Sequence, residues 1–176
     1  MDLLLATSIF SAILTALGAA FFMPQFKPFA FGFLRSRAAA LVLFGSGAIW
    51  FLYILYHLGE ADFGQYKFYL MAIFGAAGVS AFKYLPDFLS VRGLCVLALL
   101  FMRVCVDSAF MQEPESRKIM VAIAYAVVVA AIYFGCLPYR MRDLFEWLYA
   151  RECRVKAFAA ILMAAGLSMC VATLFY

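Results

Sequence analysis

Histidine and charge are both scarce in this chain. It has one histidine in 176 residues, and only 14% of its residues are charged. A single histidine excludes a haem held by two axial histidines of the same chain. No Gly-rich phosphate loop, Ser/His/Asp set or pair of metal ligands on one helix is present either. We therefore expect no cofactor, no bound metal and no catalytic site, and we predict that the protein is not an enzyme.

Ionisable groups are also missing from the middle of the apolar stretches. No lysine lies centrally in one, as a buried retinal Schiff base requires, and the only carboxylate within one, Asp107, lies near its end. Proton-coupled carriers usually hold an ionisable group deep in the membrane. The five cysteines form no CxxC pair, so we expect them to act as small apolar residues.

Apolar residues make up 68% of the chain, far above the roughly 45–50% of soluble proteins. The apolar runs are continuous blocks of about 20 residues, which is the length of a membrane-spanning helix and not the alternation of a β-barrel. We predict an all-α integral membrane protein, one bundle domain over residues 1–176, with six spans. The spans are expected at 3–22, 38–58, 64–85, 89–109, 119–137 and 157–175. The first has no positive segment before it, so we expect it to be retained and not cleaved as a signal.

Basic residues predict the orientation. Ten Lys and Arg lie in the connections after the first, third and fifth spans, and three lie in the connections after the second and fourth. By the positive-inside rule both termini lie on the non-cytoplasmic side. We expect a plasma membrane or a bacterial inner membrane. The modest net charge of +4 lies beside apolar segments, so we expect no nucleic-acid partner.

The basic connections also suggest a threefold plan. Each begins near a proline (Pro24, Pro86 or Pro138) and leads to the next span, so we predict three helical hairpins. The general rules for prolines and basic flanks produce much of this pattern without a true internal repeat.

Small residues recur at four-residue spacing in three spans, which favours close helix packing in lipid. The three series predict that the first, fifth and sixth spans form the tight centre of the bundle. Their members are Ala12, Ala16 and Ala20; Ala122, Ala126 and Ala130; and Ala160, Ala164 and Ser168. Gly45, Gly47, Gly75 and Gly78 indicate further close crossings or soft points.

Arg103 and Asp107 form a possible ion pair inside the fourth span, one helical turn apart. An arginine in the hydrocarbon region is costly unless it is paired or reaches the headgroups. One interpretation is a gate or an anion contact facing the bundle. The other, which we favour, is a structural ion pair near the outer interface.

His57, Glu60 and Asp62 form a possible acidic cluster on the outer side, which Glu113 and Glu115 of the next outer connection could approach. Imidazole and carboxylate groups suit a divalent cation. Because the spacing is loose and the histidine is single, we favour a solvated acidic surface over a metal site.

The longest polar stretch, residues 137–156, contains five basic residues and an amphipathic turn. Met141, Leu144, Phe145 and Leu148 recur at i, i+3, i+4 and i+7 and give one apolar face. We predict a short interfacial helix between the fifth and sixth spans. The apolar face is either a cytoplasmic docking face for a partner or simply the side that rests on the membrane. The Phe-rich first connection, residues 25–35, is expected to lie at the interface as well.

These patterns predict a non-catalytic polytopic membrane protein, a scaffold or accessory subunit of a larger inner-membrane assembly. Its expected partners are the lipid bilayer and other membrane subunits or copies of itself. The alternative is a small oligomeric transporter or channel whose pathway includes Arg103 and Asp107. A third interpretation is a lipid- or quinone-binding protein that uses the apolar grooves of a Phe-rich bundle.

Overall fold

The computed structural model describes residues 2–59, 63–85, 87–113 and 115–176, and these residues contain helices and no β-strand. The apolar sequence explains this outcome, because a backbone in lipid must satisfy its hydrogen bonds internally. The α-helices are α1 (Leu3–Phe22), α2 (Phe26–Leu34), α3 (Arg37–Tyr56), α4 (Lys67–Tyr84), α5 (Leu89–Ala109), α6 (Arg117–Cys136), α7 (Tyr139–Tyr149) and α8 (Glu152–Ala172). Two short 3-10 turns, η2 (Gly64–Tyr66) and η3 (Thr173–Phe175), precede α4 and follow α8.

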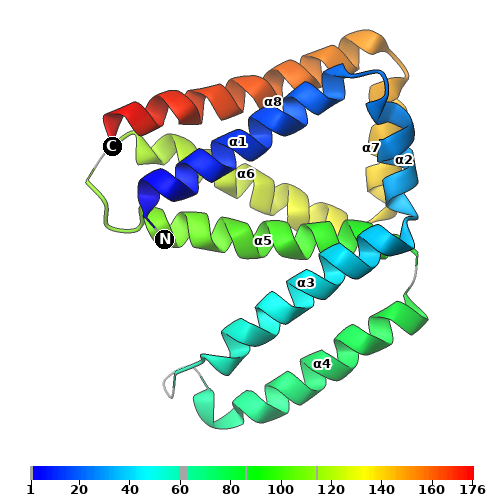
Figure 1. The fold of residues 1–176 in the computed structure, drawn as a ribbon, viewed down its shortest axis with the longest axis vertical. Coiled ribbons are helices and arrows are strands. Elements are labelled where there is room, and N and C mark those ends of the chain that lie inside the picture. The colour runs from blue at the N-terminus through cyan, green and yellow to red at the C-terminus, as the bar shows by residue number, and fades with distance from the viewer. Residues whose placement is uncertain (1, 60–62, 86, 114) are drawn as a thin grey trace.

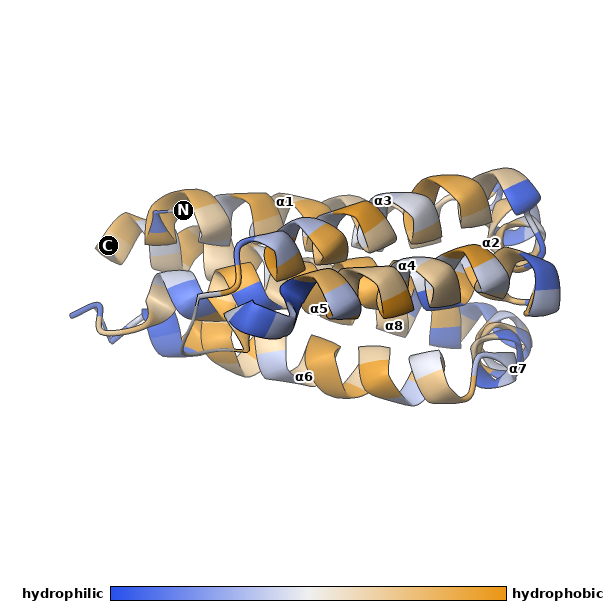
Figure 2. Cartoon of the chain, turned by 90° about the horizontal axis from the view of Figure 1, so that it is seen from below, coloured by the Kyte–Doolittle hydropathy of each residue, from blue (hydrophilic) through white to orange (hydrophobic). Residues whose placement is uncertain are grey.

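The six long helices run back and forth along the molecule, so both termini lie at the same end (Figure 1). The two short helices, α2 and α7, lie across the opposite end. Figure 2 shows apolar residues along the lengths of the long helices and polar residues gathered toward the ends. This is the distribution expected of a bundle surrounded by lipid.

Five helices are long and apolar enough to cross a membrane. They are α1, α3, α5, α6 and the segment Glu152–Phe175, which joins α8 to η3. The described residues therefore form a helical bundle whose long apolar helices fit a membrane protein. The third predicted span, α4, is not among the five, because its 18 residues include Lys67 at the start and Lys83 in the last turn, which lower its mean hydropathy.

The most extensive helix pair is α1 with α8, the first and last helices of the chain. Two glycines allow the backbones to approach closely. A Cβ added to Gly18 would lie 2.9 Å from the carbonyl oxygen of Ala159, and one added to Gly166 would lie 2.9 Å from the amide nitrogen of Thr15. The Ser11 hydroxyl donates a 2.7 Å hydrogen bond to the carbonyl of Gly166. Close approach and this interhelical hydrogen bond are the interactions that hold helices together in lipid.

The second centre of packing is the pair α3 and α5. A Cβ on Gly93 would lie 2.5 Å from the backbone nitrogen of Phe44, so α5 rests directly on the backbone of α3. At the start of α5, the Ser90 hydroxyl donates to the carbonyls of Phe33 (2.8 Å) and Leu34 (3.1 Å), which fixes the end of α2. Helix α5 thereby connects the α3 side of the molecule to α6, with which it also packs.

Helix α4 lies at the edge of the molecule and packs chiefly on α3 (Figure 1). Aromatic pairs set its register: the rings of Phe44 and Phe82 are 5.4 Å apart, and those of Phe51 and Phe74 are 5.1 Å apart. No residue of α4 is buried. Within the described part of the chain, α4 is the long helix that depends least on its neighbours.

The small-residue series do not lie where the sequence suggested. Ala12, Ala16 and all members of the α6 and α8 series are exposed, while Ser11, Thr15, Gly18 and Gly166 form the tight contact. The prediction of a tight centre from the first, fifth and sixth spans was correct only for α1 and α8. The main helix pairs also differ from the threefold hairpin plan, because α1 packs on α8 and α3 packs on α4 and α5.

One helix begins earlier than its expected span for a clear physical reason. The last span was expected to begin at residue 157, after the polar stretch, but α8 begins at Glu152. Glu152 lies in the first turn, where a carboxylate interacts favourably with the helix dipole. Its pairing with Lys156 at 3.5 Å also supports a helical first turn.

Candidate functional site

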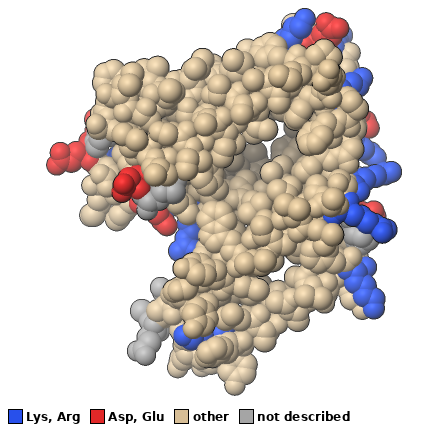
Figure 3. All heavy atoms as spheres, in the orientation of Figure 1, with Lys and Arg blue, Asp and Glu red and all other residues tan. Residues whose placement is uncertain are grey.

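Basic residues gather at the end of the molecule that carries α2 and α7. Figure 3 shows Lys and Arg along this edge and a group of acidic residues near the termini at the other end. The separation is the one that the sequence predicted from its connections. This basic end is where the chain presents polar chemistry next to apolar helices, and it is the candidate functional site.

An aromatic cluster builds the basic end by joining α1, α2, α7 and α8. The ring of Phe21, at the end of α1, lies 4.9 Å from Phe26 and 5.2 Å from Phe158. From α2, Phe31 lies 6.1 Å from both Phe145 and Tyr149 of α7. The phenylalanines of the first connection are thus used to pack α2 on α7, which explains a Phe-rich segment between two spans.

Helix α7 confirms the predicted amphipathic helix between the last two long helices, and its apolar face turns inward. Leu148 is only 1% exposed, and Met141, Leu144 and Phe145 are partly buried. Leu148 and Phe145 pack with Phe21, while Met141 packs in the cluster around Leu34. The chain itself therefore packs against the face that the sequence offered as a docking surface, most closely at Leu148.

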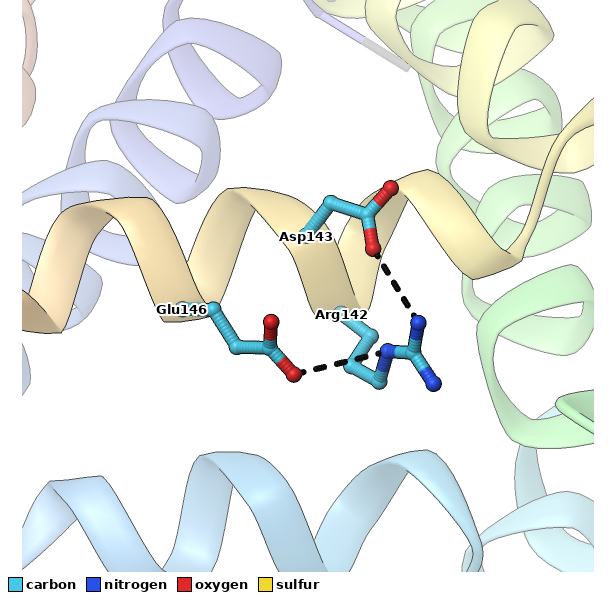
Figure 4. Close-up of polar contacts among 3 residues, drawn as sticks. All are labelled: Arg142, Asp143 and Glu146. Atoms are coloured by element: carbon cyan, nitrogen blue, oxygen red, sulfur yellow. Dashed lines mark hydrogen bonds and ion pairs between the residues drawn. The ribbon is translucent and has the colours of Figure 1, made fainter.

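The basic side chains on and beside the outer face of α7 have partners within the chain. Arg142 lies between two acids, with its Nη2 3.4 Å from Oδ1 of Asp143 and its Nε 3.5 Å from Oε1 of Glu146 (Figure 4). Arg154 lies over the ring of Trp147 and donates to that residue's carbonyl at 3.1 Å. These basic groups already have partners, so they are poor candidates for holding an external anion.

Tyr149 brings a hydroxyl into the aromatic cluster without a hydrogen-bond partner in the described structure. Burial raises the pKa of this group.

We expect Tyr149→Phe to stabilise the folded protein by about 1 kcal/mol, because the substitution removes an unsatisfied polar atom and keeps the ring. Thermal unfolding in detergent, followed by circular dichroism, measures the change. Tyr139→Phe, at an exposed tyrosine of the same helix, is the control and should change little. A loss of stability in Tyr149→Phe would show that the hydroxyl has a partner.

Arg103 and Asp107 do pair, at 3.6 Å between Nε and Oδ2, but on the outer surface of α5. Their side chains are 57% and 69% exposed. A pair that faces outward in this way suits the structural interpretation, since exposed ion pairs add roughly 0–1 kcal/mol. It gives no support to a pathway lined by these two residues.

The possible outer cluster is not assembled by the described residues. Glu60 and Asp62 lie outside them, and His57 directly follows α3, where its Nδ1 lies 2.9 Å from the carbonyl oxygen of Tyr53. Lys118 holds Glu115 and lowers its pKa, first through a hydrogen bond and then through its charge. Among the residues searched, no group of three or more His, Cys, Asp or Glu side chains could hold a metal ion.

A recess of about 380 Å³ at the basic end is the feature that sequence reasoning missed. It brings together Arg35, which follows α2, Arg37, which begins α3, and Lys83 in the last turn of α4. In the sequence these residues served only to predict the orientation, as basic residues on one side of the membrane. The sequence did not show that they share one recess, because that depends on how α4 packs against α3.

No known protein family, curated protein or solved structure matches this chain. The geometry of its own residues therefore carries the functional argument.

Proposed function

We propose that the protein is a non-catalytic, six-span subunit that assembles with other membrane helices, and that α4 is its main docking helix. The observation that carries this proposal is the exposure of α4, none of whose 18 residues is buried. A spanning helix held by one principal neighbour gains little packing from its own chain. Partner helices would supply closer van der Waals contacts with α4 than lipid does.

The sixth span in this proposal is α4 itself. Its lysines stand at the two ends, and long basic side chains reach the headgroups while their stems stay in the apolar region. Lys67 lies over the rings of Tyr56 and Phe68 at 5.3 Å and 5.4 Å, which suits an interfacial position. A length of 18 residues is at the short end of what crosses a bilayer.

The outward face of α4 has the composition that membrane helices use for packing. Ala72, Ala76 and Ser80 are exposed at four-residue spacing, on the side of the helix that is turned away from Phe74 and Gly78. Small residues at this spacing let a second helix approach closely. The exposed alanines of α6 offer a second surface of the same kind.

The basic end would face the cytoplasm of a bacterial or plasma membrane, with both termini on the other side. The transporter alternative gains nothing from this geometry. Arg103 and Asp107 pair with each other on an outer surface, whereas a pathway needs them in a wet cavity between helices.

The direct test is the mass of the protein purified in mild detergent. We expect a complex heavier than the 19.6 kDa chain, and we expect Ala76→Leu to lower the fraction in that complex at least tenfold by blocking close helix approach. Ala157→Leu, at an exposed alanine of α8, is the matched control and should leave the complex intact. A monomer with no copurifying chain, or equal loss in both variants, would refute the proposal.

A further inference from the structure

We propose that the groove bounded by α3, α4 and α5 binds one anionic phospholipid from the leaflet at the basic end. The phosphate would lie at Arg35, Arg37 and Lys83, and the acyl chains would lie against the apolar lengths of α3 and α4. This inference goes beyond the proposed assembly role, because it concerns the inner side of α4 and not its outward face.

The recess at the basic end has the charge that such a headgroup requires. Arg35, Arg37 and Lys83 line it together with Ser36 and Ser90, and no carboxylate lines it. Among the described residues, none of the three basic side chains forms an ion pair. Asp87, the acid next to this region in the sequence, lines a neighbouring recess with Arg92 instead.

Two helix N-termini add to this positive field. Helix α3 begins at Arg37, and the Ser36 side chain accepts a 3.2 Å hydrogen bond from the backbone amide of Ala39. Helix α5 begins at Leu89. Ser36 and Leu89 both line the recess. The N-terminus of a helix carries a partial positive charge and free amide groups, which favour phosphate. Basic pockets between spanning helices on the cytoplasmic side are recognised sites for anionic lipid headgroups.

An apolar groove of about 740 Å³ lies along α3, α4 and α5 beyond the recess. Phe82 lines both, so the basic recess and the apolar groove adjoin. The groove is bounded by Phe44, Phe51 and Leu52 of α3, Phe74 and Gly78 of α4, and Leu99 of α5. Charge at one end and apolar walls beyond it match an amphiphile better than a soluble anion.

Two glycines of α4 keep the groove open. A Cβ added to Gly75 or Gly78 would meet nothing within 4 Å, and both glycines line the groove. They therefore do not mark the close crossings that the sequence suggested. The missing side chains leave space that the chain does not fill itself and that an acyl chain can use.

The length of the groove fits one leaflet. Lys83 and Phe74 are nine positions apart on α4, which is about 14 Å of helix at 1.5 Å per residue. Half of a typical hydrocarbon core is about 15 Å. A lipid with its phosphate at Lys83 would therefore extend its chains to about the depth of Phe74.

The test is native mass spectrometry of the full chain in mild detergent, with added phosphatidylglycerol or phosphatidylcholine. We expect one phosphatidylglycerol to be retained per chain and phosphatidylcholine to be lost under the same conditions. The triple variant Arg35→Gln, Arg37→Gln, Lys83→Gln should weaken phosphatidylglycerol binding at least tenfold. Lys67→Gln, at the opposite end of α4, is the matched control and should bind like the wild type.

A second variant tests the apolar half without changing any charge. Gly75→Leu with Gly78→Leu should also weaken phosphatidylglycerol binding at least tenfold, and circular dichroism should show unchanged helix content. If the double variant fails to fold, Gly78→Leu alone serves the same purpose.

Three results would overturn the lipid proposal. They are equal retention of both lipids, competition by millimolar glycerol phosphate, and release of a bound protein chain by the groove variants. Competition by glycerol phosphate would indicate a soluble anion site, and release of a protein chain would indicate a helix in the groove. Ala76→Leu, on the opposite face of α4, should leave lipid binding unchanged, so failure of this proposal and failure of the assembly proposal are distinguishable.

Discussion

Gly93→Val should separate α3 from α5 and destabilise the folded protein by about 3 kcal/mol. A Cβ at this position would lie 2.5 Å from the backbone nitrogen of Phe44 and 2.8 Å from its Cα. Both atoms belong to the backbone of α3, so no side chain can turn aside to relieve the overlap. The helices must move apart, and the contact that joins α3 and α4 to the rest of the molecule is lost.

A cysteine placed in the α3–α5 contact provides the measurement. Leu100 lies seven positions after Gly93 on the same face of α5, is 9% exposed and lines the groove with Phe51 and Leu52 of α3. With the exposed Cys136, Cys153 and Cys170 replaced by alanine and Leu100 replaced by cysteine, maleimide labelling at position 100 should become much faster in Gly93→Val. Labelling of Cys105, in the separate cluster with α1 and α8, should change far less.

Gly45→Val is the matched control for this substitution. Gly45 lies in α3, and a Cβ there would meet nothing within 4 Å. The control introduces the same side chain into a neighbouring apolar helix where its Cβ meets no neighbour, so its unfolding temperature and labelling at position 100 should stay close to those of the protein without the substitution. Equal effects of the two variants would mean that valine acts through the helix itself and not through the contact with α3.

The sequence predicted helix positions well because that signal is local. Apolar blocks of spanning length gave α1 and α5 with the observed ends, and the i, i+3, i+4 spacing around Phe145 gave α7. Each depends only on neighbouring residues and on the thickness of a bilayer. The status of α4 as a span stays a prediction, because lysines at both ends reduce its apolar length.

Helix pairing was harder to predict, because it depends on which faces meet. Alanine series at four-residue spacing were taken as packing faces, yet Ala122 and Ala160 are exposed. Gly18 and Gly166 form the real contact between α1 and α8, although they are far apart in the sequence and belong to no series. A small residue permits another helix to approach closely. The sequence does not show whether that helix belongs to the same chain or to another molecule.

The same limit applies to the candidate site. The positions of Arg35, Arg37 and Lys83 in the connections predicted that they lie on one side, and in the structure they lie at the same end of the molecule. Their convergence on one recess follows from the packing of Phe82 on Phe44, which sets where α4 ends relative to α3. Such an aromatic contact leaves no mark in a sequence where phenylalanine is abundant.

Gly166→Leu should open the other main contact, between α1 and α8, at a cost of about 3 kcal/mol or more. The first atom of the new side chain would overlap the Thr15 hydroxyl and would lie 2.9 Å from the Thr15 amide nitrogen and 3.0 Å from the Ser11 carbonyl oxygen. Moving α8 away also breaks the 2.7 Å hydrogen bond from Ser11 to the carbonyl of Gly166. Because this pair joins the two ends of the chain, no neighbouring segment of sequence holds the helices together once the contact is lost.

The readout for this contact is a native buried cysteine. Cys105 is fully buried among Phe10 of α1, Met120 of α6 and Met169 of α8. In the background with Leu100→Cys and without exposed cysteines, maleimide should label Cys105 much faster in Gly166→Leu, while position 100 stays protected. Gly45→Leu is the matched control, since a Cβ there meets no neighbour within 4 Å. If position 100 and Cys105 became accessible together in both Gly166→Leu and Gly93→Val, the two contacts would form one cooperative unit. Separate opening instead means that the pair α3 and α4 can move against a stable core of α1, α5, α6 and α8, which is the motion that would widen or close the groove beside α4.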